Sequence, residues 1–548
     1  MEIVRRRRQC EAIPASSAVA MAVFEQSGMR ALIDSLVKHG SDRKLSPGMA
    51  VKAMIAPIHD ARRKMPLSGL RHFFENAPAD LLFGKDVSTE SLNDNAFARN
   101  LDDIFDAGLD HIFAKCSAHA KRRFGFDSKI KHADATDYTI WAVPKEYYET
   151  NNAAVPAFGG NAKNKRNDLM QYKAATITDG DRILEYCKAY SGNAADCAMN
   201  ADTLEFLKGC ANPHENTVIA DCKLVNDDLI AKMRGMNIGF ISKLPSSFSR
   251  KVRDRIVASA LSSKMTDSSV KGYMTYETEA DTEECGKLRF IAYRSPKGTG
   301  RAMNYLEKQG LREAEGRFKV FAKKEFMCEA DALNAFNDAM KEHKNSAYAV
   351  TADIVGTEVI IPKKGRGRYP KGYVPETEVR WSVNVSMSFD AERAKELAGS
   401  RCMSVIVTNL PAASADAGNI RYGATTDTVL RLYLDQYKVE HTYRLMKSGM
   451  GVDSVYVRTP SRANALLFVV AIATLVSSMM DAILRRNGKG RQKTVKQICT
   501  EIQSASVEYY RSENSISVFG SDRCEDRVFE FMDAIGLDPS HLLEIFDG

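Results

Sequence analysis

The feature that most restricts the fold of this chain is a long apolar stretch at positions 463–484, ANALLFVVAIATLVSSMMDAIL. A helix of this length and composition could cross a membrane. Polar side chains interrupt the stretch, however, at Asn464, Thr474, Ser477, Ser478 and Asp481. The sequence contains no second stretch of this kind. We therefore predict a helix buried at the centre of a large domain, which requires a chain long enough to build an extensive core.

The composition agrees with a large globular protein. At 548 residues, the chain exceeds the usual length of one domain. Its hydrophobic content of 44% and charged content of 27% are typical of soluble folded proteins and not of disordered ones. The net charge of +7 comes from 77 basic and 70 acidic residues, so local clusters of charge matter more than the total.

Cysteine spacing and the missing catalytic motifs exclude several classes of protein. The eleven cysteines include no C-x-x-C pair, which argues against a zinc ribbon and a disulfide framework and suits a reducing cytoplasm. The N-terminus, MEIVRRRRQC, is not followed by a long apolar run, so we expect no secretory signal. There is no P-loop, H-E-x-x-H or G-x-S-x-G motif, so ATPase, zinc protease and serine hydrolase functions lack support.

Residues 17–125 have the spacing of amphipathic helices. Ser46 and Pro47 supply an N-cap and a proline at the first helical position. We predict a helical N-terminal domain over residues 1–125. The basic side chains at its end fit either a DNA-binding bundle or an ordinary solvated surface; they are His119, Lys121, Arg122 and Arg123.

From Lys129 the periodicity changes to that of β strands, with helices between the later ones. This order predicts a mixed α/β sheet with helices packed on it, over residues 126–248. Asp134 lies inside the first strand, where a carboxylate is costly without a partner. Asp221 ends the apolar strand TVIAD, at the edge where α/β sheets place their sites. Each aspartate is either a functional group or a strand-end or turn residue.

Residues 249–400 return mainly to β patterns, with a charged helical stretch at 301–342. Within them, IPKKGRGRYPKGY carries five basic residues without an acidic one; they are Lys363, Lys364, Arg366, Arg368 and Lys371. A loop of this kind can follow DNA phosphates or enter a minor groove. A solvated hairpin tip is the alternative.

The segment 401–484 contains a second helical pattern besides the apolar one, TTDTVLRLYLDQYKVEHTYRLMKS, starting near residue 425. Tyr433, Glu440 and Lys447 recur every seven residues, so a continuous helix places them on nearly one face, with Gln436 one turn before Glu440. Such a stripe suits either a metal and a phosphate or a solvated helix surface. Residues 485–548 follow as a basic linker and a helical C-terminal region.

Taken together, these motifs resemble the DDE transposases of prokaryotic insertion sequences. The D-A-T at 134–136 looks like the family's first-aspartate strand, and TVIAD looks like its second. Tyr433, Gln436, Glu440 and Lys447 match the family signature Y-x2-R-x3-E-x6-K at three of four positions. The resemblance covers about residues 25–485. It implies an α/β fold: an RNase H-like core interrupted by a mostly β insertion domain, with a helical N-terminal domain that binds DNA.

The resemblance also implies a chemistry. In this family Asp134, Asp221 and Glu440 would be the catalytic residues and would hold two Mg²⁺ or Mn²⁺ ions, which prefer carboxylate oxygens. Tyr433, Gln436 and Lys447 would contact DNA, although Gln436 departs from the family's arginine. The basic loop, with Arg366, Arg368 and Lys371, would be a further DNA contact.

The function implied is cut-and-paste transposition. The protein would bind the inverted repeats of an element and its target DNA, work as a homodimer or higher oligomer on paired ends, and act on the nucleoid in the cytoplasm. Two alternatives stay open at this point. One is an RNase H-like nuclease without strand transfer, and the other is an inactive DNA-binding or architectural descendant.

Overall fold

The computed structural model describes most of the chain. The described residues are 11–60, 69–139, 153–158, 168–210, 212–221, 226–245, 250–282, 286–361, 371–436, 459–488, 493–511, 516–520 and 525–537, with Glu440, Thr442, Tyr443, Met446 and Leu542. They form two compact units. The first unit comprises Met1–Ser242, Asn409–Ala424 and Arg431–Gly548, and the second comprises Lys243–Thr408 and Thr425–Leu430.

The first unit begins with a set of helices, as the amphipathic spacing predicts. They are α1 (Ala15–Gln26), α2 (Met29–Leu36), α3 (Pro47–Ile58), α4 (Leu70–Phe73), α5 (Ala79–Phe83), α6 (Asp94–Asp106) and α7 (Leu109–Phe124). The start of α3 is the predicted one, because Ser46 Oγ accepts a hydrogen bond from the Met49 backbone N–H at 3.3 Å and Pro47 follows the cap.

The sheet of the first unit is mixed, which confirms the predicted α/β class. Its strands are β2 (Ile130–Thr139), β3 (Ala157–Phe158), β4 (Met170–Asp179), β5 (Leu184–Ser191), β6 (Thr217–Ala220) and β7 (Gly239–Lys243). Strand β2 pairs antiparallel with β4, which pairs antiparallel with β5 and β3. On its other side β2 runs parallel to β6, and β6 runs parallel to β7. Helices α8 (Asp196–Lys208) and α9 (Asp227–Gly235) connect the later strands. This is the RNase H-like arrangement that the resemblance implies.

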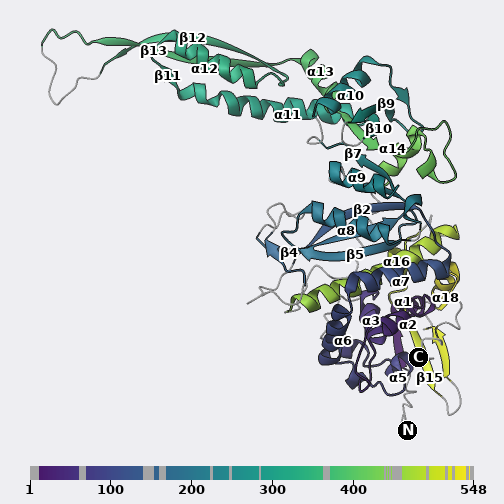
Figure 1. Ribbon diagram of the computed structural model, residues 1–548. Coiled ribbons are helices and arrows are strands. Elements are labelled where there is room, and N and C mark those ends of the chain that lie inside the picture. Colours follow the sequence, from purple (N-terminus) through teal and green to yellow (C-terminus); the bar gives the residue numbers. More distant parts are fainter. Residues whose placement is uncertain are drawn as a thin grey trace. The chain divides into compact units, whose positions relative to one another are not determined.

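The apolar stretch forms α16 (Pro460–Arg486), the longest helix among the described residues. It is the one described helix that is long and apolar enough to cross a membrane, and 94% of its most apolar window is buried inside the protein. It packs against α1, α3, α6 and α7 on the N-terminal side and against β5 of the sheet (Figure 1). Its side chains join those of the N-terminal helices and the sheet in one core. The prediction of a buried central helix is confirmed.

The C-terminal region differs in part from the prediction. Helices α17 (Val495–Glu501) and α18 (Glu525–Ala534) are present, but two strands lie between them, β15 (Ser506–Arg511) and β16 (Ile516–Gly520). Strand β15 pairs with β1 (Glu11–Pro14), so the two ends of the described chain share a three-stranded sheet. The alternation of buried and exposed residues in SVEYYR is that of a strand.

The second unit includes residues 249–400, which are predicted as a mostly β insertion, and the described elements there are helices as well as strands. Its helices are α10 (Arg250–Ser262), α11 (Gly298–Phe318), α12 (Glu329–Glu342) and α13 (Ala391–Arg401). Its strands are β8 (Thr266–Asp267), β9 (Met274–Thr282), β10 (Gly286–Arg294), β11 (Glu325–Phe326), β12 (Tyr348–Ile360), β13 (Thr377–Phe389) and β14 (Met403–Thr408). Strands β14, β10, β9 and β8 pair in that order. Strands β12 and β13 form a long ribbon that extends beyond α12 (Figure 1).

Short 3₁₀ turns complete the described elements, at Thr89–Ser91, Pro213–Glu215, Lys319–Lys323 and Ile420–Tyr422. Helix α14 (Thr426–Leu434) begins in the second unit and passes into the first at Arg431.

Candidate active site

Asp134 lies in the middle of β2, on a face of the sheet that other elements cover. Its carboxylate Oδ1 accepts a hydrogen bond from the Ala135 backbone N–H at 2.7 Å, and the residue is half-buried. Its direct cross-strand partner on β4 is Thr176. Tyr138, four residues further along β2, points to the same face because side chains alternate along a strand. Thr176 and Tyr138 are therefore neighbours of Asp134 on the same face of the sheet.

Asp221 directly follows β6, the parallel neighbour of β2, and is exposed. The last printed pair in this ladder is His132 with Ile219, an offset of 219 − 132 = 87. Continued two residues beyond that pair, the same offset (221 − 134 = 87) would bring Asp221, the residue after β6, level with Asp134. The Ser242 hydroxyl on β7 donates to the Asp221 carbonyl oxygen at 2.6 Å.

The segment that carries Glu440 is docked on the face of the sheet that carries Asp134. Glu440 itself is helical and exposed. Tyr443, one turn later, is buried, and its hydroxyl forms a 2.7 Å hydrogen bond with Thr176 Oγ1. The Tyr138 hydroxyl donates to Met446 Sδ at 3.4 Å. Two contacts therefore join the Glu440 segment to β2 and β4 on either side of Asp134.

The pKa of Tyr443 reflects its position beside Asp134. Burial raises the pKa of Tyr443 well above its usual value of 10.0, and the nearby Asp134 carboxylate raises it further, because a phenolate there would be desolvated and repelled. The phenol of Tyr443 is consequently neutral and close to Asp134. Residues three apart on a helix are neighbours, so Glu440 and Tyr443 share one side of their helical turn.

The three carboxylates have the chemistry that a hard divalent cation prefers, since all their ligand atoms are oxygens. Within the residues that the structure describes, no three His, Cys, Asp or Glu side chains lie close enough together to hold a metal ion. The assignment of Asp134, Asp221 and Glu440 as a shared metal site therefore stays a prediction.

The predicted continuous helix around Glu440 is interrupted. Helix α14 ends at Leu434, and Asp435 and Gln436 form a turn, in which the Gln436 N–H donates to the Tyr433 carbonyl at 3.3 Å. This three-residue hydrogen bond closes the helix and replaces the four-residue spacing of an α-helix. Tyr433 lies in the last turn of α14 and is half-buried, as is Gln436. The two residues precede Glu440 without belonging to one unbroken stripe.

The remaining predicted DNA contacts are less well described. Lys447, Arg366 and Arg368 lie outside the described residues. Lys371 is exposed in a turn that leads into β13. Their roles stay predictions.

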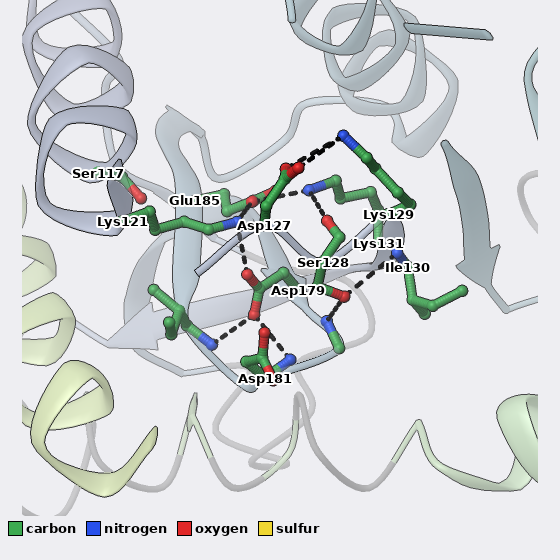
Figure 2. Close-up of polar contacts among 12 residues, drawn as sticks. Ser117, Lys121, Asp127, Ser128, Lys129, Ile130, Lys131, Asp179, Asp181 and Glu185 are labelled. Atoms are coloured by element: carbon green, nitrogen blue, oxygen red, sulfur yellow. Dashed lines mark hydrogen bonds and ion pairs between the residues drawn. The ribbon is translucent and has the colours of Figure 1, made fainter. Parts of the chain in front are cut away.

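A buried ion-pair network that the sequence pattern does not indicate lies on the face of β2 opposite Asp134. Lys131 is three residues before Asp134 on β2, so its side chain points to the opposite face. Its ammonium group binds Glu185 at 2.7 Å, and Lys121 of α7 binds both Glu185 and, at 2.6 Å, Asp179 (Figure 2). Lys121 belongs to the predicted basic edge, but it is buried in ion pairs and does not contribute free surface charge. No local motif marks these residues, because Lys121, Lys131, Asp179 and Glu185 come from four separate elements.

This buried network also holds the tight turn between β4 and β5. Asp179 Oδ1 accepts hydrogen bonds from the backbone N–H groups of Asp181 and Ile183, both at 2.9 Å (Figure 2). Burial raises the pKa of Asp179 to about 6, against the effect of Lys121. Burial lowers the pKa of Lys121, but Glu185 and Asp179 outweigh it and raise that pKa above its usual value. Lys121, Lys131 and Glu185 also line a pocket of about 700 Å³ between α7 and α8.

Two family models match the chain. Residues 135–476 match the model described as a transposase DDE domain. Residues 15–118 match a model described as a domain of unknown function, DUF4277. The first match contains Asp221 and Glu440 and begins at the residue after Asp134. No curated protein matches this chain.

Proposed function

Because this chain belongs to the family of the transposase DDE domain, we propose that it cuts the ends of a mobile DNA element and joins them to target DNA. DNA recombination by transposition is the activity of that family. Cleavage at both ends followed by strand transfer, the cut-and-paste route, is the specific part of the proposal.

One observation carries the proposal to particular residues. Asp134 lies in β2 and Asp221 directly follows β6, the parallel neighbour of β2, while the segment with Glu440 is anchored to the cross-strand neighbour of Asp134 by the hydrogen bond between Tyr443 and Thr176. Three carboxylates distant in sequence thus belong to three neighbouring elements of the first unit. Packing alone does not explain the carboxylate in β2, because a charged group in a strand is costly without a partner.

The donor set fits Mg²⁺ or Mn²⁺. Asp134, Asp221 and Glu440 would hold the ions together. When bound, such ions supply positive charge that stabilises the attacking and leaving oxygens of a phosphodiester. That charge would draw the three carboxylates together, so we expect ion binding to order Glu440.

We expect the DNA to be held by groups around these carboxylates. Lys447 would hold a phosphate near the cleaved bond, and Tyr433 and Gln436 would contact the same strand. The basic loop with Arg366, Arg368 and Lys371 would follow the backbone further along the duplex. The helical N-terminal domain would bind the inverted repeats, and two or more copies would act on paired ends in the cytoplasm.

The test uses purified protein, Mg²⁺, labelled DNA with the inverted repeats that flank the gene, and a target plasmid. The wild-type protein should release the ends and join them to the plasmid. Glu440→Gln and Asp134→Asn should bind the DNA but not cleave it. Glu530→Gln, the same substitution on the exposed face of α18, should cleave normally. Cleavage without joined products would identify a nuclease, and unimpaired cleavage by Glu440→Gln would refute the assignment of the site.

A further inference from the structure

The first turn of α14 is held by a set of charged and polar contacts within the second unit. Thr425–Leu430 belong to that unit, and the same segment then continues into the first unit toward Glu440. The residues that hold this turn are therefore placed to control where the Glu440 segment starts. Nothing in the sequence pattern of α14 itself indicates such an anchor.

The centre of the anchor is an ion pair with a buried arginine. Arg289 on β10 is 3% exposed, and its guanidinium binds Glu277 on β9 through Nε to Oε1 at 2.7 Å and Nη2 to Oε2 at 2.9 Å. Arg289 Nη2 also donates to Thr426 Oγ1 at 3.3 Å, and the Thr426 hydroxyl donates to Glu277 Oε2. The first residue of α14 thus completes a three-residue network with both members of the pair.

A second contact holds the next residue of the helix. The Asp427 carboxylate accepts hydrogen bonds from the Ser268 hydroxyl at 2.5 Å and from the Ser269 backbone N–H at 2.9 Å. Val429 and Leu430 complete the turn as fully buried side chains. Consecutive residues of the turn are therefore fixed by two separate parts of the second unit.

The chemistry of this anchor favours positioning over stability. Burying an arginine and a glutamate costs so much solvation that apolar residues of the same size often stabilise a fold equally well. A bidentate pair also fixes the orientation of its partners, because the planar guanidinium donates its two hydrogen bonds in one geometry. Such a network suits a helix whose register has to be fixed, whereas apolar packing would be enough to bury its side chains.

We propose that Arg289, Glu277 and Thr426 are positioning residues that fix the start and register of α14, the helix from which the chain leads on to the Glu440 segment. This inference rests on the proposed role of Glu440 in cleavage. The insertion would then act as more than a surface for DNA, because its β9–β10 hairpin would hold the start of the helix that precedes the third carboxylate.

The test removes one hydroxyl and leaves the ion pair intact. Thr426→Val loses both hydrogen bonds while keeping the shape of the side chain, and Thr426→Ser restores the hydroxyl. Lys287→Met is the matched control. Lys287 and Glu279 form a diagonal ion pair between β10 and β9 in the same way as Arg289 and Glu277, but the Lys287 side chain is 65% exposed. Four quantities are measured: amide hydrogen exchange over residues 428–434, the cleavage rate of pre-bound element ends, the affinity for DNA and the melting temperature.

Thr426→Val should exchange faster over these residues and cleave roughly 10- to 100-fold more slowly, since small misplacements of a catalytic group have effects of this size. Its affinity for DNA should be unchanged, and Thr426→Ser and Lys287→Met should behave like the wild type. Normal cleavage by Thr426→Val would overturn the inference, whether or not exchange is faster. So would slow cleavage that Thr426→Ser fails to restore.

Asp427→Asn tests the same idea through the second contact and guards against a folding defect at Thr426. It should also slow cleavage at an unchanged melting temperature. If both variants lost activity only together with their fold or their DNA affinity, the residues would serve stability alone and the inference would be wrong. If the wild type failed to cleave at all, the proposed function would fail, while hydrogen exchange would still report on the anchor.

Discussion

At the scale of single residues, the hydrogen bond between Tyr443 and Thr176 connects the Glu440 segment to the strand beside Asp134. Tyr443→Phe removes one partner and leaves the fully buried Thr176 hydroxyl unsatisfied. We predict a loss of about 1–2 kcal/mol in the free energy of unfolding, measured by chemical denaturation. Tyr305→Phe, which removes a partly exposed bond to Glu313, should cost much less. An equal loss of unfolding free energy in the two variants would show that the hydrogen bond to Thr176 stabilises the protein no more than an exposed one.

His59 makes the stability of the first unit sensitive to acid. It is buried between α3 and α16, with Nδ1 against the Ile55 carbonyl at 2.9 Å and Nε2 at 3.0 Å from Ser477 Oγ. Burial lowers its pKa below the usual 6.5, since a charged imidazole there would be desolvated. The unfolded chain therefore takes up a proton that the folded protein resists, and the free energy of unfolding falls as pH falls below 6.5.

Thermal melting at about pH 7.5 and about pH 5.5 checks this expectation. From the higher to the lower pH, the melting temperature of the wild type should fall further than that of His59→Gln. His72→Gln is the control, because the His72 side chain is 69% exposed and its removal should leave the acid dependence intact. An unchanged dependence in His59→Gln would assign the effect to other groups.

At this scale the sequence predicts the three carboxylates but does not indicate their surroundings. Asp134, Asp221 and Glu440 stand in short motifs with recognisable spacing. Thr176 and Tyr443 do not, because a hydroxyl pair across a sheet depends on the register of two distant segments. Tyr443 could have been suspected, since it lies one turn after Glu440 on the same side of a helix.

At the scale of elements, α16 is the main contributor to the core of the first unit. Leu475, at its centre, is fully buried. We predict that Leu475→Ala lowers the free energy of unfolding by about 2–5 kcal/mol, through the lost apolar contact and the cavity left behind. Leu261→Ala on α10 is the control, because that leucine is 48% exposed and should cost little. A small loss at Leu475 would mean that α16 is less central than its burial indicates.

Helices and strands with a strong period were predictable, whereas their ends and partners were not. The apolar run of α16 and the cap of α3 were identified from their residues alone. The turn at Asp435 and Gln436 was missed, because the heptad spacing of Tyr433 and Glu440 suggests one continuous helix. Strands β15 and β16 were missed for a different reason: short strands acquire their identity from a partner, and the partner of β15 is β1, at the other end of the chain.

At the scale of the whole molecule, the helical N-terminal region, the mixed sheet and α16 form one unit with one core. The resemblance implied the RNase H-like core and an insertion before Glu440, and the charged pattern at 301–342 predicted helices where α11 and α12 lie. Helices α10 and α13 were not predicted, because they are short and charged and contribute little apolar periodicity.

Removal of divalent ions should separate DNA binding from cleavage. With a chelator present, the protein should still bind element ends through its basic groups, and cleavage should stop. Adding back Mg²⁺ or Mn²⁺ should restore cleavage, whereas Ca²⁺ should support binding alone. Gel shift and cleavage assays on the same labelled DNA check this. Cleavage at full rate in the chelator would contradict a metal-dependent mechanism.

We propose that Asp134, Asp221 and Glu440 jointly hold a divalent ion. Replacing Mg²⁺ with Fe²⁺ and adding ascorbate and peroxide cuts a polypeptide next to the bound ion, and mass spectrometry of the fragments locates the cuts. We expect cuts near residues 134, 221 and 440 that Mg²⁺ suppresses and that are absent in Asp134→Asn. Cuts confined to other parts of the chain, or unaffected by that substitution, would contradict it.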